Sequence, residues 1–323
     1  MLAIRLSLGS VVVLSLLACG GDILGRDGKE ADADADADSD ADADADSDAD
    51  ADSDADADGD ADTLTLDHDE DAITTRETAV FVASAGGKDV TEDAEWTTDD
   101  RDVARIYTAG VVQPLLLGEV TVTATWKGQE VTATVTVTDI PAAENGDLVF
   151  NEVLADVPSG GDPNEDGTAD SVEDEFVEIA NKGTSTVRLD GFTLWDSDND
   201  TARHTFATDT ILRAGDAVVV FGGGDVSFSA THCEAVAADN ADSDLQHGLA
   251  LSNDGDRILL KDTSDTTVAS MAYDTEVADA SWLLWPELDG TDYIDHTEQG
   301  AEYSPCTLAD GSIMPGVEER YGG

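Results

Sequence analysis

The sequence predicts an all-β protein, with two tandem β-sandwich domains that follow a disordered acidic linker. Between residues 63 and 273, short runs rich in Val, Thr, Ile and aromatic residues recur with Gly-containing turns between them, a pattern typical of strands. The later part of this region contains no run of ten residues with convincing helical periodicity. Residues 31–62 carry Asp at every even position and offer no apolar face to bury. The chain therefore combines an unstructured segment with two all-strand domains.

Residues 1–18 have the features of a lipoprotein signal peptide. Arg5 is the only charge before the apolar stretch 6–17, which suits an export signal but is too short to span a bilayer. The sequence Leu16-Leu17-Ala18-Cys19 resembles the lipobox of bacterial lipoproteins. This resemblance implies cleavage before Cys19, lipidation of its thiol and attachment to a membrane. The alternative is an ordinary secretory signal with an incidental cysteine.

Residues 19–62 are expected to form the lipidated Cys and a disordered Asp/Ala-rich tether. The sixteen Asp residues of 31–62 repel one another, so we reject a strand despite the alternation. Fully extended, this segment reaches roughly 100 Å. Gly20 and Gly21 follow Cys19 without an Asp, which resembles the sorting pattern of outer-membrane lipoproteins. We therefore expect a lipid-anchored, surface-exposed protein of the cell envelope, in the outer membrane.

The chain is strongly acidic, with 15 Lys and Arg against 73 Asp and Glu and a formal net charge of −58. Nucleic acids and anionic lipid headgroups are bound through basic patches, so both are poor partners for this chain, and we expect no nucleic-acid binding. The expected partners are the membrane, through the N-terminal lipid, and an extracellular protein or glycan that the sequence does not identify.

The first domain is expected over residues 63–140. Thr and Val alternate within it, most clearly in 120–125 and 131–137, so Val would face a core and Thr the solvent. Trp96 is expected to pack between the sheets, with stacking on a carbohydrate as the alternative. Phrases of this segment resemble the group 2 bacterial Ig-like domain, namely Glu95-Trp96-Thr97-Thr98-Asp99, Asp102-Val103-Ala104 and Gly118-Glu119-Val120-Thr121-Val122-Thr123-Ala124. That family occurs in surface proteins and adhesins, so the resemblance implies an Ig-like sandwich that acts as a stalk or binding module.

The second, larger domain is expected over residues 146–320. Three of its phrases resemble the lamin tail domain, which is also Ig-like: Asn151-Glu152-Val153-Leu154-Ala155-Asp156, Asp174-Glu175-Phe176-Val177-Glu178-Ile179-Ala180-Asn181 and Tyr303-Ser304-Pro305. In bacteria this family usually serves for presentation or attachment. Cys306 departs from the pattern, because bacterial members often have Gly after Ser-Pro.

Residues 162–173 match the twelve-residue calcium loop at its ligand positions. Calcium prefers six to eight hard oxygens, and Gly167 permits the sharp turn at the sixth position. The flanking residues are not helical, and position eight is Ala169 rather than a branched apolar residue. We therefore predict a structural Ca²⁺ ion, with a plain solvated loop as the alternative. The expected ligands are Asp162, Asn164, Asp166, Thr168, Asp170 and Glu173.

Two cysteines, Cys233 and Cys306, remain once Cys19 is lipidated. An even pair in an oxidising compartment predicts one disulfide. The alternative is two separate buried thiols.

No catalytic residue is predicted, because the sequence has no Gly-x-Ser-x-Gly nucleophile motif, no phosphate loop and no paired histidines of the kind that hold a catalytic metal. Trp282 and Trp285 are expected in the core rather than as a sugar-binding platform. The predicted function is non-enzymatic: presentation of the two modules at the cell surface for binding or adhesion. One alternative is an accessory module or degenerate hydrolase that acts on extracellular polymer; another is a purely structural envelope protein. The histidines are scattered at His68, His204, His232, His247 and His296.

Overall fold

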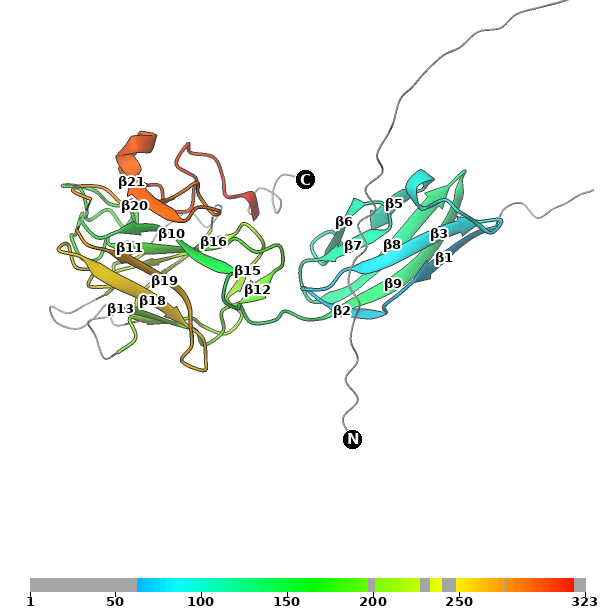
Figure 1. Cartoon of the computed structure of the whole chain (residues 1–323), viewed down its shortest axis with the longest axis horizontal. Helices are drawn as coiled ribbons and strands as arrows, with labels where there is room; N and C mark the ends of the chain where they lie inside the picture. The colour runs from blue at the N-terminus through cyan, green and yellow to red at the C-terminus, as the bar shows by residue number, and fades with distance from the viewer. Residues whose placement is uncertain (1–62, 197–200, 227–232, 240–247, 276, 317–323) are drawn as a thin grey trace, which may run out of the picture. The chain divides into compact units, whose positions relative to one another are not determined.

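The computed structural model describes residues 63–196, 201–226, 233–239, 248–275 and 277–316 (Figure 1). Its named elements are 21 strands and two short 3-10 helices, so the predicted all-β class is confirmed. Within these residues, no helix is long and apolar enough to cross a membrane. The predicted signal peptide, the lipidation site Cys19 and the tether all lie outside the described residues.

Residues 64–139 form the first sandwich, which has two sheets whose strands are antiparallel except for β2 (Ala72–Thr74) and β9 (Gln129–Asp139). One sheet has the order β1 (Leu64–His68), β3 (Ala79–Ala85), β7 (Val111–Pro114), β6 (Ala104–Thr108), and β4 (Lys88–Asp89) pairs with β3. The other has the order β2 (Ala72–Thr74), β9 (Gln129–Asp139), β8 (Gly118–Trp126), β5 (Glu95–Thr98), and the 3-10 helix η1 (Thr91–Asp93) precedes β5.

The Thr/Val alternation sets the two faces of β8 and β9, as the sequence predicts. Val120, Val122, Val135 and Val137 are buried in one apolar cluster with residues of the opposite sheet, while the intervening Thr side chains are partly or fully exposed. Trp96 on β5 is half-buried against this core, and its indole Nε1 donates to the carbonyl of Thr91 at 2.9 Å. The expected packing of Trp96 is therefore present, with part of the ring left at the surface.

The second domain is built on a six-stranded sheet. Its order is β17 (Glu234–Ala237), β16 (Ala217–Phe221), β11 (Phe176–Asn181), β10 (Leu148–Leu154), β20 (Trp282–Trp285), β21 (Asp292–Asp295), and only β16 and β17 run parallel. A second sheet has the order β14 (His204–Thr205), β13 (Thr193–Asp196), β18 (Asp256–Lys261), β19 (Thr267–Tyr273). The remaining elements are the pair β12 (Val187–Arg188) and β15 (Ile211–Leu212) and the 3-10 helix η2 (His296–Gln299).

A bulge in β10 decides which residues face the core of this domain. The pairing of β10 with β11 shifts register between Phe150 and Glu152, so Asn151 is the extra residue. Phe150 and Val153 therefore share the face that packs on the second sheet. Glu152 turns to the opposite face, beside Leu154 and the next strand's Glu178.

Candidate functional site

Two carboxylates lie side by side on the outer face of the six-stranded sheet. Glu152 on β10 and Glu178 on β11 are partners in the strand register, and neither side chain has exposed surface. The face is covered by the chain that follows η2, since Cys306 and Tyr303 pack on Phe176 and Phe221 of the sheet. Like charges directly opposite each other are unfavourable unless other groups compensate.

Glu152 is held by three side chains from the C-terminal part of the domain. Its Oε1 accepts from the hydroxyl of Ser281 at 2.6 Å and from the main-chain N–H of Ser304 at 2.9 Å, and it lies 3.1 Å from Nδ1 of His296. Its Oε2 accepts from the hydroxyl of Ser304 at 3.1 Å. His296 and Ser281 are fully buried. Both oxygens of Glu152 are therefore used inside the protein.

Glu178 is held by the bulge residue and by the covering segment. Asn151 donates its Nδ2 to one carboxyl oxygen at 2.8 Å, and the N–H of Cys306 donates to the other at 2.7 Å. Burial, reinforced by the negative charge of Glu152, raises the pKa of Glu178 to about 8. Burial, and then the same charge, also raises the pKa of Glu287, whose carboxylate accepts from the N–H of Ala309 at 3.0 Å.

Ser304, His296 and Glu152 contact one another in the order of the serine, histidine and acid of a hydrolase catalytic triad. The Ser304 hydroxyl lies 3.3 Å from Nε2 of His296, whose Nδ1 faces Glu152. A relay needs a nucleophile that a substrate can reach and a histidine free to take its proton. Here His296 and Glu152 have no exposed surface, and Ser304 donates both its hydroxyl and its N–H to Glu152. The geometry supports a brace that ties the C-terminal segment to the sheet.

Sequence reasoning missed this cluster. The histidines were scattered along the chain, and Glu152 and His296 are 144 positions apart. A usable signal was present, because a Glu inside an otherwise apolar strand, as in Val177-Glu178-Ile179, indicates a buried partner.

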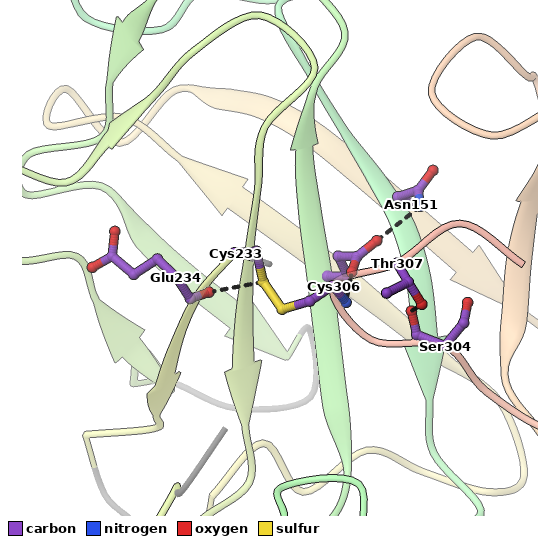
Figure 2. The surroundings of a disulfide bond; sticks show 7 residues. Asn151, Cys233, Glu234, Ser304, Cys306 and Thr307 are labelled. Atoms are coloured by element: carbon purple, nitrogen blue, oxygen red, sulfur yellow. Dashed lines mark hydrogen bonds between the residues drawn. A yellow bond between two sulfur atoms is a disulfide. The ribbon is translucent and has the colours of Figure 1, made fainter. Parts of the chain in front are cut away.

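A disulfide links the covering segment to the edge of the same sheet. Cys233, which immediately precedes β17, is bonded to Cys306, with their Cα atoms 5.3 Å apart (Figure 2). This agrees with the predicted pairing. Cys306 has φ of +67°, in the left-handed region that favours glycine. The backbone at position 306 therefore has a conformation that Gly adopts without strain.

The oxygens of the predicted calcium loop accept hydrogen bonds from its own backbone. Asp162 accepts from the N–H groups of Asp166 and Gly167, and Asn164 also accepts from Asp166. Asp166 accepts from Thr168, and Asp170 accepts from Val172 and Glu173. Among the described residues, no group of three or more His, Cys, Asp or Glu side chains is arranged to hold a metal ion.

The loop nevertheless gathers negative charge around a buried carboxylate. Asp174, directly after the twelve residues, has no exposed surface and accepts from the N–H groups of Asn164 and Asp170. Burial raises the pKa of Asp174, and the charges of Asp162 and Asp166 add to this. A cation would relieve this repulsion, so the loop chemistry fits calcium, and calcium binding stays a prediction.

The two predicted core tryptophans do not form a sugar platform. Trp282 is half-buried against the main core, whereas Trp285, three positions along β20, is 40% exposed. Residues three apart on a strand lie on opposite faces. The core prediction is therefore met by Trp282 and is wrong for Trp285.

Residues 141–275 match the family model of the Lamin Tail Domain. The match ends before β20, β21 and η2, so Ser281, His296, Ser304 and Cys306 lie beyond it. The search of curated proteins found no match. The likeness of residues 63–140 to the group 2 bacterial Ig-like domain stays a prediction.

Solved structures give distant likenesses. A DUF4876 family protein from Bacteroides thetaiotaomicron VPI-5482 is 14% identical, with a TM-score of 0.24; the alignment covers 53% of this chain and 62% of that one, less than two thirds of its length. Domains 5-6 of the S-layer protein SbsC are 13% identical over 67% of this chain and 97% of theirs, with a TM-score of 0.21. The assignment therefore rests on the family model: residues 141–275 form a lamin-tail-like domain.

Proposed function

We propose that this protein is a lipid-anchored component of the bacterial cell envelope that displays two β-sandwiches for binding or adhesion, without catalysis. The proposal that the protein is not catalytic rests on the hydrogen bonds of Glu152, whose two carboxyl oxygens are both occupied by groups of the protein itself. Each oxygen of that carboxylate accepts bonds that hold the domain together, and the histidine beside it has no exposed surface. This cluster, which most resembles a reactive site, thus supports a structural role, because its bonds hold the C-terminal segment on the sheet.

The anchoring part of the proposal rests on the N-terminal sequence. Lipidation of Cys19 would add two or three acyl chains, each buried methylene contributing roughly 0.8 kcal/mol to membrane attachment. The aspartates of 31–62 would keep the tether extended and hold the domains away from the membrane. The outer membrane is the location that fits Gly20 and Gly21.

Cell fractionation tests the anchor. In the native host, wild-type protein should sediment with outer membranes, and mass spectrometry should find a lipid on an N-terminal Cys19. The variant Cys19→Ala should appear in the soluble fraction. Proteinase K added to intact cells should remove the wild-type domains if they face outward. An unmodified, soluble wild-type protein would refute the anchor, and protection in intact cells would refute surface display.

The order of Ser304, His296 and Glu152 keeps a hydrolase as the second candidate. A fluorophosphonate probe distinguishes the two, because it labels serines activated by a histidine. We expect no labelling of the folded protein. Labelling that disappears in Ser304→Ala would establish the hydrolase and overturn the display proposal.

A further inference from the structure

The edge strands β5 and β6 of the first sandwich border a pocket of about 330 Å³. Each strand ends its own sheet, and the short turn 99–103 connects them (Figure 1). The pocket lies at the open side of the sandwich, where no further strand of the described chain pairs with either edge. It is lined by Trp96 and Thr98 of β5, Arg101 of the turn, and Arg105, Ile106 and Tyr107 of β6.

Two arginines meet at this pocket in a chain that has 15 basic residues against 73 acidic ones. The Nε of Arg105 donates to the carbonyl of Arg101 at 3.0 Å, which fixes the guanidinium of Arg105 against the turn. Arg101 is exposed, and the described residues give its side chain no ion pair. A guanidinium fork matches the two oxygens of a carboxylate, so this wall is suited to an anionic group.

Two of the three aspartates of the turn, Asp99 and Asp100, accept hydrogen bonds from the backbone. Asp99 accepts from the N–H of Thr121 at 2.7 Å, and this bond lowers the pKa of Asp99. Asp100 accepts from the N–H groups of Asp102 and Val103. None of these three aspartates lines the pocket. The charged residues that line the pocket are therefore both basic, although the protein as a whole is acidic.

Two aromatic rings supply the other contact surface. The indole of Trp96 is held in place by its bond to Thr91, and Tyr107 is 59% exposed. An aromatic ring at a pocket wall can pack on the apolar face of a sugar ring. Pockets for small ligands start at roughly 300 Å³, so the volume suits one or two rings rather than a polymer.

We propose that this pocket binds the terminal, carboxylate-bearing sugar of a glycan, with Arg101 and Arg105 on the carboxylate and Trp96 and Tyr107 on the ring. A long polyanion would be repelled by the net charge of −58, whereas a single carboxylate interacts mainly with charges within a Debye length of about 8 Å. The inference specifies the ligand of the proposed display function, and it rests on that function only for access to the glycan.

Calorimetry with the detergent-solubilised full mature chain tests the pocket. The probe is a trisaccharide that ends in glucuronic acid, and the comparison ligand is the same trisaccharide ending in glucose. We expect the acidic sugar to bind roughly tenfold tighter, the factor given by one charge-assisted hydrogen bond. Arg101→Ala should remove the preference for the acidic sugar, and Tyr107→Ala should weaken the binding of both trisaccharides. Because both side chains are exposed, the variants should melt at the wild-type temperature.

Lys127→Ala is the matched control. Lys127 lies over the ring of Trp126 at 3.9 Å in the same domain, and it does not line the pocket, so binding should be unchanged. Equal binding of the two sugars, no binding, or unchanged binding by Arg101→Ala would overturn the proposal. Tighter binding of an Asp-rich hexapeptide would overturn it in favour of a peptide site. The purified protein is used throughout, so a negative result here and a failure of membrane anchoring are separate outcomes.

Discussion

The left-handed backbone at Cys306 leads to a prediction about glycine at this position. On a Cys233→Ala background, which removes the disulfide, Cys306→Gly should give a protein about as stable as Cys306→Ala, without the usual penalty for glycine. Replacing Ala by Gly at a buried position normally destabilises, because Gly loses more backbone freedom on folding and buries less surface. Cys306 is fully buried but has φ of +67°, where a Cβ is strained and Gly is not.

The magnitudes decide the comparison. A non-Gly residue in the left-handed region costs about 1–2 kcal/mol, and the methyl group that Gly lacks contributes about 0.8 kcal/mol on burial. Gly also loses about 0.5–1 kcal/mol more backbone freedom than Ala on folding. The relief of strain therefore cancels the usual penalty of the Ala-to-Gly change, and the two variants should have nearly equal stability. Both variants should lie about 4 kcal/mol below the oxidised wild type, since the disulfide closes a loop with a sequence separation of 73.

Two measurements on the full chain give these differences in the transition of the second domain: urea unfolding monitored by fluorescence, and calorimetry. Ala180→Gly is the control, because Ala180 is fully buried on β11 without a left-handed backbone, and this change should destabilise by about 1–2 kcal/mol. The reasoning fails if Cys306→Gly is less stable than Cys306→Ala by as much as Ala180→Gly destabilises the wild type. It also fails if reduction of the wild type leaves the midpoint unchanged.

The remaining predictions concern charge, calcium and the covering segment. Because the pKa of Glu178 is raised from 4.5 to about 8, the folded state binds the extra proton, so stability should fall as pH rises between these values, and Glu178→Gln should flatten that slope in urea titrations. Calcium should raise the melting temperature of the wild type and of the loop control Asp254→Ala but not of Asp166→Ala; no rise in the wild type would remove the calcium prediction. A chain that ends at residue 275 should aggregate, as measured by light scattering, because Phe176 and Phe221 lose their cover; a soluble monomer would contradict this.

The strand pattern was readable from the sequence where alternation was regular. Val120 and Val122 on β8 face the core because each second residue of a strand points to the same side. The same rule fails at β10, since it would place Phe150 and Glu152 on one face. The bulge at Asn151 separates them, and single-residue insertions of this kind depend on the partner strand rather than on local sequence.

The buried polar cluster could not be assembled from the sequence for a related reason. Its members come from β10, β11, the start of β20, η2 and the segment after it, and nothing in their spacing brings them together. A local motif does not settle the function of a loop by itself. The loop 162–173 fits a calcium pattern by spacing, yet side chains of this type also satisfy their own backbone N–H groups, as Asp162 and Asp166 do here.

The two buried glutamates explain how the C-terminal segment finds its register on the sheet. Apolar contacts with Phe176 and Phe221 would hold the segment in place but would tolerate a shift along the sheet, because they have no direction. The N–H of Ser304 and that of Cys306, two residues apart, instead donate to carboxylates on adjacent strands, Glu152 and Glu178. A shift of one residue would leave the buried carboxylate of Glu152 and the buried carboxyl group of Glu178 without these donors, a cost of several kcal/mol. This register also brings Cys306 opposite Cys233, so the hydrogen bonds would position the thiols before the disulfide forms.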